Sequence, residues 1–296
     1  MPTRLTRLSL VVACLMTLAG CSKHIDDSGS NGPGPTPLPP GPVTYSAIAA
    51  SDGAGAGSSV PCLPFTPCTD GTGYVPVVAR QLRADGHAVT LLNMGIPGAV
   101  LSRATQDLGN KYGLGISANF IQDEAQFVKP DSTLVTIFAG GNDANTIGTV
   151  IERGATTNEN ATSYIDGQIR QFASDYKQLV SIVRARAPNA RLVILNLPNL
   201  AGLPYTAGRT PTERRWIQQL SVGFTRLGAN PFAGQSAIVI DLMCDPRSYQ
   251  ASNYSSDGFH PNDAGYQFLA NEVLDAVKAG SWPAPSDSCA QMTLAP

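Results

Sequence analysis

The sequence carries little charge and has no excess of basic residues. Its 296 residues include 20 lysines and arginines against 22 aspartates and glutamates, a formal net charge of −2 at pH 7. Proteins that bind nucleic acid usually present a basic face, so we expect no nucleic-acid partner. Histidine is also scarce, with three in the chain. Because histidine is the usual proton-transferring base near neutral pH, any site that uses one has few candidates.

The N-terminus has the pattern of an export signal. Arg4 and Arg7 precede an apolar stretch at 8–18, and Leu18-Ala19-Gly20-Cys21 follows. The stretch is too short to span a bilayer, which needs about 20 residues. The pattern resembles the lipobox of bacterial lipoproteins, which implies a signal peptide at 1–20 and acyl chains on Cys21. Such chains would tether the protein to a membrane of the cell envelope, with the outer membrane or cell surface favoured. An ordinary secretory signal is the alternative.

Residues 21–43 are predicted to be a linker between this anchor and one globular domain at 44–296. The linker is rich in Ser, Gly and Pro, a composition that buries little surface and stays extended. His24 lies in it and is therefore a poor candidate for a built site. We expect the protein to be a monomer.

Four cysteines remain once Cys14 leaves with the signal and Cys21 carries lipid. An even number in an exported protein indicates disulfides, and four cysteines allow three pairings. We favour Cys62–Cys68, which closes a small loop, and Cys244–Cys289, which pins the C-terminal tail. A zinc site is the alternative, although Cys-x-x-Cys spacing is missing.

Short β-rich runs alternate with amphipathic helical stretches along the domain. The predicted strands are 44–50, 88–93, 133–138, 191–197 and 237–242, and three of them are nearly continuous apolar runs, as in a buried parallel sheet. The predicted helices are 74–84, a stretch through Ile165 to Val183, 211–227 capped by Thr210, and 262–279. This alternation predicts an α/β fold, a three-layer sandwich. Its site should lie in the loops beyond the strand ends, at 52–73, 95–103, 140–160 and 198–210.

Two other segments carry a possible nucleophile and a possible base. Ser51 directly follows the first strand and precedes a run of glycines and alanines. His260 lies three residues after Asp257, so a tight turn could place the carboxylate on one imidazole nitrogen and leave the other free. His87 should lie at the opposite end of the sheet. Ser51 could equally be an incidental serine in a flexible turn, and His260 a surface histidine.

An ester-cleaving site also needs donors for the oxyanion of the tetrahedral intermediate. Gly98, in Asn93-x-Gly95-x-x-Gly98, could offer a backbone N–H, and Asn142, in Gly140-Gly141-Asn142-Asp143, a side-chain NH₂. Both segments could also be ordinary turns.

Together the four segments resemble the SGNH, or GDSL, family of serine hydrolases. The specific matches are Gly140-Gly141-Asn142-Asp143 and Asp257-x-x-His260-Pro261. The resemblance implies a flavodoxin-like three-layer α/β/α sandwich with a five-stranded, mainly parallel sheet. It also implies Ser51 as nucleophile, His260 with Asp257 as base, and an oxyanion hole from Ser51 N–H, Gly98 N–H and Asn142.

One segment departs from the family pattern: Ala50 stands where the family usually has an aspartate before the serine. In the family this aspartate supports the geometry of the site, and Asp52 could supply some of that support in its place.

The resemblance implies two-step hydrolysis of carboxylic esters without metal or organic cofactor. We favour lipid or simple acyl esters, with Phe65, Ile147, Val150, Leu203 and Tyr205 as candidate apolar contacts. A carbohydrate O-deacetylase and a non-catalytic surface-binding lipoprotein are the alternatives.

Overall fold

The computed structural model describes residue 38 and residues 40–293. The predicted signal peptide, Cys21 and most of the predicted linker lie outside the described residues. At the linker's end, Leu38 packs against the helical layer around α8 (Asp263–Lys278), and its N–H donates to Val277 O at 3.2 Å. The end of the linker therefore contacts the domain, although its composition predicts almost no burial.

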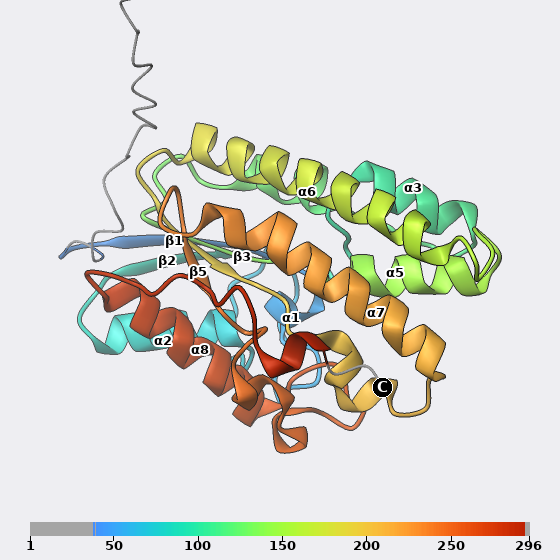
Figure 1. Ribbon diagram of the computed structural model, residues 1–296. Coiled ribbons are helices and arrows are strands. Elements are labelled where there is room, and N and C mark those ends of the chain that lie inside the picture. The colour runs from blue at the N-terminus through green and yellow to red at the C-terminus, as the bar shows by residue number, and fades with distance from the viewer. Residues whose placement is uncertain (1–37, 39, 294–296) are drawn as a thin grey trace, which may run out of the picture. The chain divides into compact units, whose positions relative to one another are not determined.

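Five strands form a parallel sheet in the order β2-β1-β3-β4-β5 (Figure 1). Their bounds are Val43–Ala49 (β1), Val89–Asn93 (β2), Leu134–Phe138 (β3), Arg191–Leu195 (β4) and Ile238–Ile240 (β5). All five were predicted to within two residues at each end. Because all pairs are parallel, the carboxyl ends of the strands meet at one edge of the sheet, where the loops that follow them gather.

Helices cover both faces of the sheet (Figure 1). One apolar cluster joins side chains of β1 to α2 and α8, and the other joins the opposite face to α5, α6 and α7. The helices are α1 (Ser51–Ala54), α2 (Tyr74–Ala84), α3 (Arg103–Lys111), α4 (Phe120–Asp123), α5 (Gly141–Glu152), α6 (Ala161–Arg186), α7 (Pro211–Gly223) and α8. Short 3₁₀ turns occur at Ala125–Phe127, Leu200–Gly202, Pro204–Thr206, Asn230–Phe232, Pro246–Tyr249, Ala251–Asn253 and Ala290–Thr293. The predicted three-layer α/β/α sandwich is confirmed.

The predicted start of α7 is confirmed in detail. The Thr210 side chain accepts the Glu213 N–H, and the Glu213 carboxylate accepts the Thr210 N–H, which is a complete capping box. The end differs from the prediction: α7 stops at Gly223, and the chain continues as a π-helical segment, Phe224–Ala229.

One predicted loop was wrong. Residues 140–160 were expected to be irregular, but Gly141–Glu152 form helix α5. Glycine, asparagine and threonine have low helix propensity, yet burial of one face of this segment stabilises the helix. Ile147 and Val150, predicted to contact substrate, lie instead in the interior, 1% and 0% exposed. Their side chains support α5.

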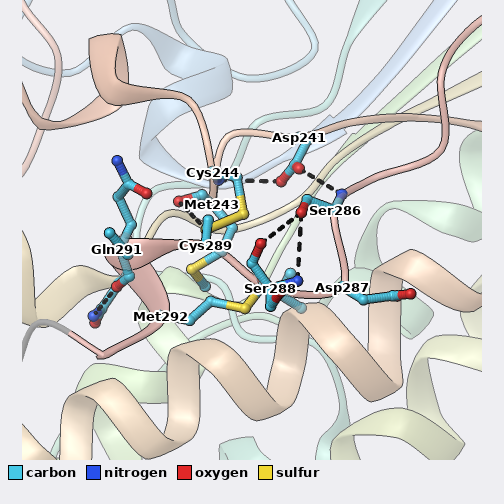
Figure 2. The surroundings of a disulfide bond; sticks show 12 residues. Asp241, Met243, Cys244, Ser286, Asp287, Ser288, Cys289, Gln291 and Met292 are labelled. Carbon is cyan, nitrogen blue, oxygen red and sulfur yellow. Dashed lines mark hydrogen bonds between the residues drawn. A yellow bond between two sulfur atoms is a disulfide. The ribbon is translucent and has the colours of Figure 1, made fainter.

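The C-terminal tail runs along β5, the edge strand of the sheet. The Trp282 indole N–H donates to Val239 O at 3.1 Å, and Ser286 N–H donates to the Asp241 carboxylate at 2.9 Å. The disulfide Cys244–Cys289 fastens the tail (Figure 2). The second disulfide joins Cys62 and Cys68, so both predicted pairings are confirmed.

Among the described residues, none of the helices combines the length and the apolar character that crossing a membrane requires.

Candidate active site

Ser51 is the first residue of α1, immediately beyond the carboxyl end of β1. It is only 6% exposed. The Asn93 side chain joins this turn to the one after β2, because its Nδ2 donates to Gly53 O at 2.7 Å and its Oδ1 accepts the Gly95 N–H at 3.2 Å. The four-residue helix is thus braced against the neighbouring strand's turn, which limits the positions that the Ser51 hydroxyl can take.

His260 connects Ser51 to Asp257. Its Nε2 lies 2.8 Å from Ser51 Oγ, and its Nδ1 lies 2.6 Å from Asp257 Oδ2. The other carboxylate oxygen accepts the N–H groups of Phe259 and His260 at 2.8 and 2.9 Å, and the Ser255 hydroxyl at 2.9 Å. Partial burial alone would raise the pKa of Asp257, but these hydrogen bonds, led by that of His260, outweigh it and hold the pKa well below its usual value. Asp257 is therefore an anion at neutral pH, and it orients the imidazole.

Gly57 allows the His260 turn to lie directly on the loop after α1. A Cβ at position 57 would lie 2.7 Å from Pro261 O and 2.9 Å from His260 Cβ. Its φ of +86° is also one that residues with a side chain rarely adopt. Glycine is therefore required here on two grounds, and both bear on the position of His260.

The oxyanion-hole candidates lie on two adjoining loops. Asn142 Nδ2 donates to Ala99 O at 2.9 Å, which ties the start of α5 to the loop of Gly98 and leaves one amide hydrogen of Asn142 free. Within the described part of the chain, the N–H groups of Ser51 and Gly98 have no protein acceptor. Unpaired donors at the ends of these strands are what a developing negative charge needs.

A cavity of about 70 Å³ adjoins the triad-like arrangement and has mainly apolar walls. Asn142 and His260 both border it, and Phe138, Leu197 and Leu203 form part of the wall. The prediction that Leu203 contacts the cavity agrees with its place in this wall. Phe65 lies elsewhere: it is 42% exposed and makes an edge contact with Phe127.

Aromatic side chains gather next to His260. The ring of Phe259 meets that of His260 edge-on at 5.0 Å, and Tyr205 meets Phe259 at 4.9 Å. Tyr205 is fixed by a hydrogen bond from its hydroxyl to Asn145 Oδ1 at 3.0 Å. Tyr205 therefore contributes to the surroundings of the site through Phe259.

Three further acids lie around these loops: Glu124 and Asp143 are buried, and Asp52 is half-buried. Burial raises the pKa of Asp52 to about 6 and that of Asp143 to about 7. Asp143 accepts the Leu101 N–H with both oxygens, at 3.0 and 3.1 Å. Burial also raises the pKa of Glu124 well above its usual value, against the hydrogen bonds from Ala49 and Ile96.

Glu124 is the residue near the site that sequence analysis missed. It follows Asp123 in a polar stretch that contains no recognisable motif, and its sequence neighbours do not distinguish it from a surface acid. His87 lies before β2 as predicted, away from Ser51, where its Nδ1 pairs with Gly41 O at 2.8 Å. Across residues 38 and 40–293, no group of three or more His, Cys, Asp or Glu side chains is placed to hold a metal ion.

Solved structures share this fold. The lipase Lip_vut3 from a goat rumen metagenome is 18% identical, with a TM-score of 0.51, and the similarity covers 80% of this chain and 98% of that one. An extracellular lipase from Streptomyces rimosus is also 18% identical, with a TM-score of 0.54, covering 81% of this chain and 100% of that one. At this level of identity the likeness establishes the fold. No curated protein sequence matches the chain.

Fold and motifs together define a carboxylic-ester hydrolase of the SGNH type. Residues 50–268 match the model of the GDSL-like Lipase/Acylhydrolase family, and the chain belongs to that family.

Proposed function

We propose that Ser51 is the nucleophile, His260 its base and Asp257 the residue that orients the base. The observation that carries this proposal is the unbroken pair of hydrogen bonds, 2.8 Å from Ser51 Oγ to His260 Nε2 and 2.6 Å from His260 Nδ1 to Asp257. These contacts lie beside an apolar cavity at the carboxyl end of the sheet.

The reaction proceeds by two acyl transfers. His260 takes the proton of Ser51 as the hydroxyl oxygen attacks the ester carbonyl, and the alcohol then leaves with that proton. Water, deprotonated by His260, attacks the acyl-serine, and the acid is released as His260 returns the proton to Ser51 Oγ. In both steps the N–H groups of Ser51 and Gly98 and the free amide hydrogen of Asn142 stabilise the oxyanion.

The cavity favours short acyl groups. Its volume is about 70 Å³, well below the roughly 300–1,000 Å³ of pockets that enclose drug-sized ligands. Apolar walls suit a short acyl chain, because burial of its hydrocarbon part is favourable and the ester group is its one polar end. We propose simple esters with short acyl chains as substrates.

A carbohydrate O-deacetylase is the second candidate. The Tyr205–Phe259 pair lies against His260, where the leaving alcohol would depart, and aromatic rings are suited to packing against sugar rings. An acetyl group needs less room than the longer acyl chains. Release of acetate from acetylated oligosaccharides, at a kcat/KM above that for acetate esters of simple alcohols, would favour this candidate.

The decisive experiment compares Ser51→Ala with Ser256→Ala in esterase assays and fluorophosphonate labelling. Ser256 is an exposed serine next to Asp257. Only an activated serine reacts with the probe, so we expect Ser51→Ala to lose both labelling and turnover while Ser256→Ala keeps them. Labelling that persists in Ser51→Ala would refute the assignment. Failure of the wild type to label would instead favour a non-catalytic binding protein.

We also propose that the protein is anchored to the cell envelope by acyl chains on Cys21. The supporting observation is the sequence Leu18-Ala19-Gly20-Cys21 after a short apolar stretch. Metabolic labelling with a fatty-acid analogue tests this: the wild type should take up label and fractionate with membranes, and Cys21→Ser should do neither. Equal labelling of both would contradict the proposal.

A further inference from the structure

Glu124 lies fully buried behind the loops that carry the proposed nucleophile and oxyanion donors. It follows α4 and is 0% exposed. Its Oε2 accepts the Ala49 N–H at 3.0 Å, and its Oε1 accepts the Ile96 N–H at the longer distance of 3.4 Å. One carboxylate therefore binds the backbone of two different segments.

The two segments diverge where Glu124 binds them. Strands β1 and β2 pair up to Ala47 and Asn93, and Met94 N–H still donates to Ala47 O at 3.0 Å. Beyond that point the chain after β2 turns away, so the Ala49 N–H has no partner from β2. A buried N–H without an acceptor is strongly unfavourable, and Glu124 supplies the acceptor that the strand no longer provides.

The two N–H groups that Glu124 binds lie at the same sequence distance from the residues of the proposed mechanism. Ala49 is two residues before Ser51, and Ile96 is two residues before Gly98. A shift of either loop along the carboxylate would change the separation between the hydroxyl of Ser51 and the N–H of Gly98. Separations of this kind must be held to within a fraction of an ångström for efficient catalysis.

We infer that Glu124 is a positioning residue, which sets the nucleophile turn against the oxyanion turn through its two backbone hydrogen bonds. This inference rests on the proposed function. It also explains how the site is supported with Ala50 in place of an acid: Ala50 is 5% exposed and belongs to the same apolar cluster as Ala125, the residue after Glu124. The supporting carboxylate comes from a different part of the chain.

The test measures kcat and KM for a short-chain ester with the full-length protein and four variants. Glu124→Gln keeps the size of the side chain, but its NH₂ replaces one of the two acceptor oxygens, so one of the two backbone hydrogen bonds is lost. Glu124→Asp keeps the carboxyl group but is one methylene too short to reach both loops. Asp123→Asn is the matched control, because this adjacent acid instead accepts the Asn119 N–H. Ser51→Ala reports on the proposed function separately.

We expect kcat to fall roughly 10-fold to 10²-fold in both Glu124 variants, with KM within about twofold of the wild type, because misplaced oxyanion donors weaken transition-state binding. Inactivation by an organophosphate should slow in parallel, while Asp123→Asn behaves as wild type. Circular dichroism and melting temperature identify the folded variants. If Glu124→Gln does not fold, the kinetics of Glu124→Asp test the inference.

Two results would overturn the inference: a kcat within twofold of the wild type in a folded Glu124 variant, or an equal loss in Asp123→Asn. An active Ser51→Ala would instead refute the proposed function, so the two failures are distinguishable.

Discussion

The Nε2 of His260 lies 2.8 Å from the Oγ of Ser51, although 209 positions separate the two residues in the chain. Ser51 is held at the end of the central strand β1, and His260 is held by a short turn just before α8. Their contact depends on α8 packing beside α2 across the same face of the sheet. The proposed chemistry is therefore a property of the assembled sandwich, and the following predictions test the parts that assemble it.

Asp257→Asn should lower kcat on the order of 10⁴-fold while leaving the protein folded. The amide would donate to His260 Nδ1 and stabilise the wrong tautomer, so Nε2 would no longer be free to accept the Ser51 proton. Steady-state kinetics with a short-chain ester measure the effect, and circular dichroism checks the fold. A loss smaller than about tenfold would mean that His260 does not depend on Asp257 for its orientation.

Gly57→Ala should lower kcat by roughly 10²-fold through displacement of His260. The added methyl group would lie within 3 Å of Pro261 O and His260 Cβ, at a backbone φ of +86° that alanine disfavours. Gly208→Ala is the matched control, because a Cβ there has no neighbour within 4 Å. Comparable kinetics for the two variants would show that the close approach of the His260 turn is unimportant.

Asp52→Asn should stabilise the protein more at pH 8 than at pH 4. Burial raises the pKa of Asp52 from its ordinary 3.8 to about 6. Between these values the folded protein holds the proton more tightly than the unfolded chain does, so the wild type loses stability as pH rises through that window.

The asparagine variant does not titrate there, so its advantage in the free energy of unfolding should grow by roughly 2 kcal/mol between pH 4 and pH 8. Guanidinium unfolding at both pH values measures this. The exposed Asp70→Asn controls for the loss of a negative charge, and a pH-independent advantage would contradict the raised pKa.

Removing Cys244–Cys289 should destabilise the protein more than removing Cys62–Cys68. The first bridge closes a separation of 45 residues and the second closes one of 6. The loss of chain entropy in the unfolded state grows with loop length, to about 4 kcal/mol for the longer loop against about 2 kcal/mol for the shorter one. Paired Cys→Ser variants, compared by chemical unfolding, test the order. The opposite order would show that strain or local packing outweighs loop entropy.

The elements with strong patterns were predictable from the sequence. Three of the five strands were recognisable as nearly continuous apolar runs, which are stable only when both faces of a strand are covered. The long spacing pattern from Ile165 to Val183 matched α6 because every one of those residues faces the core. Ser51, Asn142 and His260 could be named as candidates because local motifs at the ends of strands and before a helix mark them.

Other features depended on contacts between distant segments, which no local pattern records. Helix α5 forms from residues with poor helix propensity because its buried face packs in the interior. Phe259 and Tyr205 meet next to His260 because two loops converge, and Glu124 matters because it reaches two turns that leave neighbouring strands.

Local residue order thus specified the strands, the helices α2, α6, α7 and α8, and the reactive side chains, since each depends on its immediate neighbours and on burial. The spacing between those side chains, the size of the cavity and the support beneath the nucleophile depended on how the layers pack, because each involves groups brought together from separate parts of the chain.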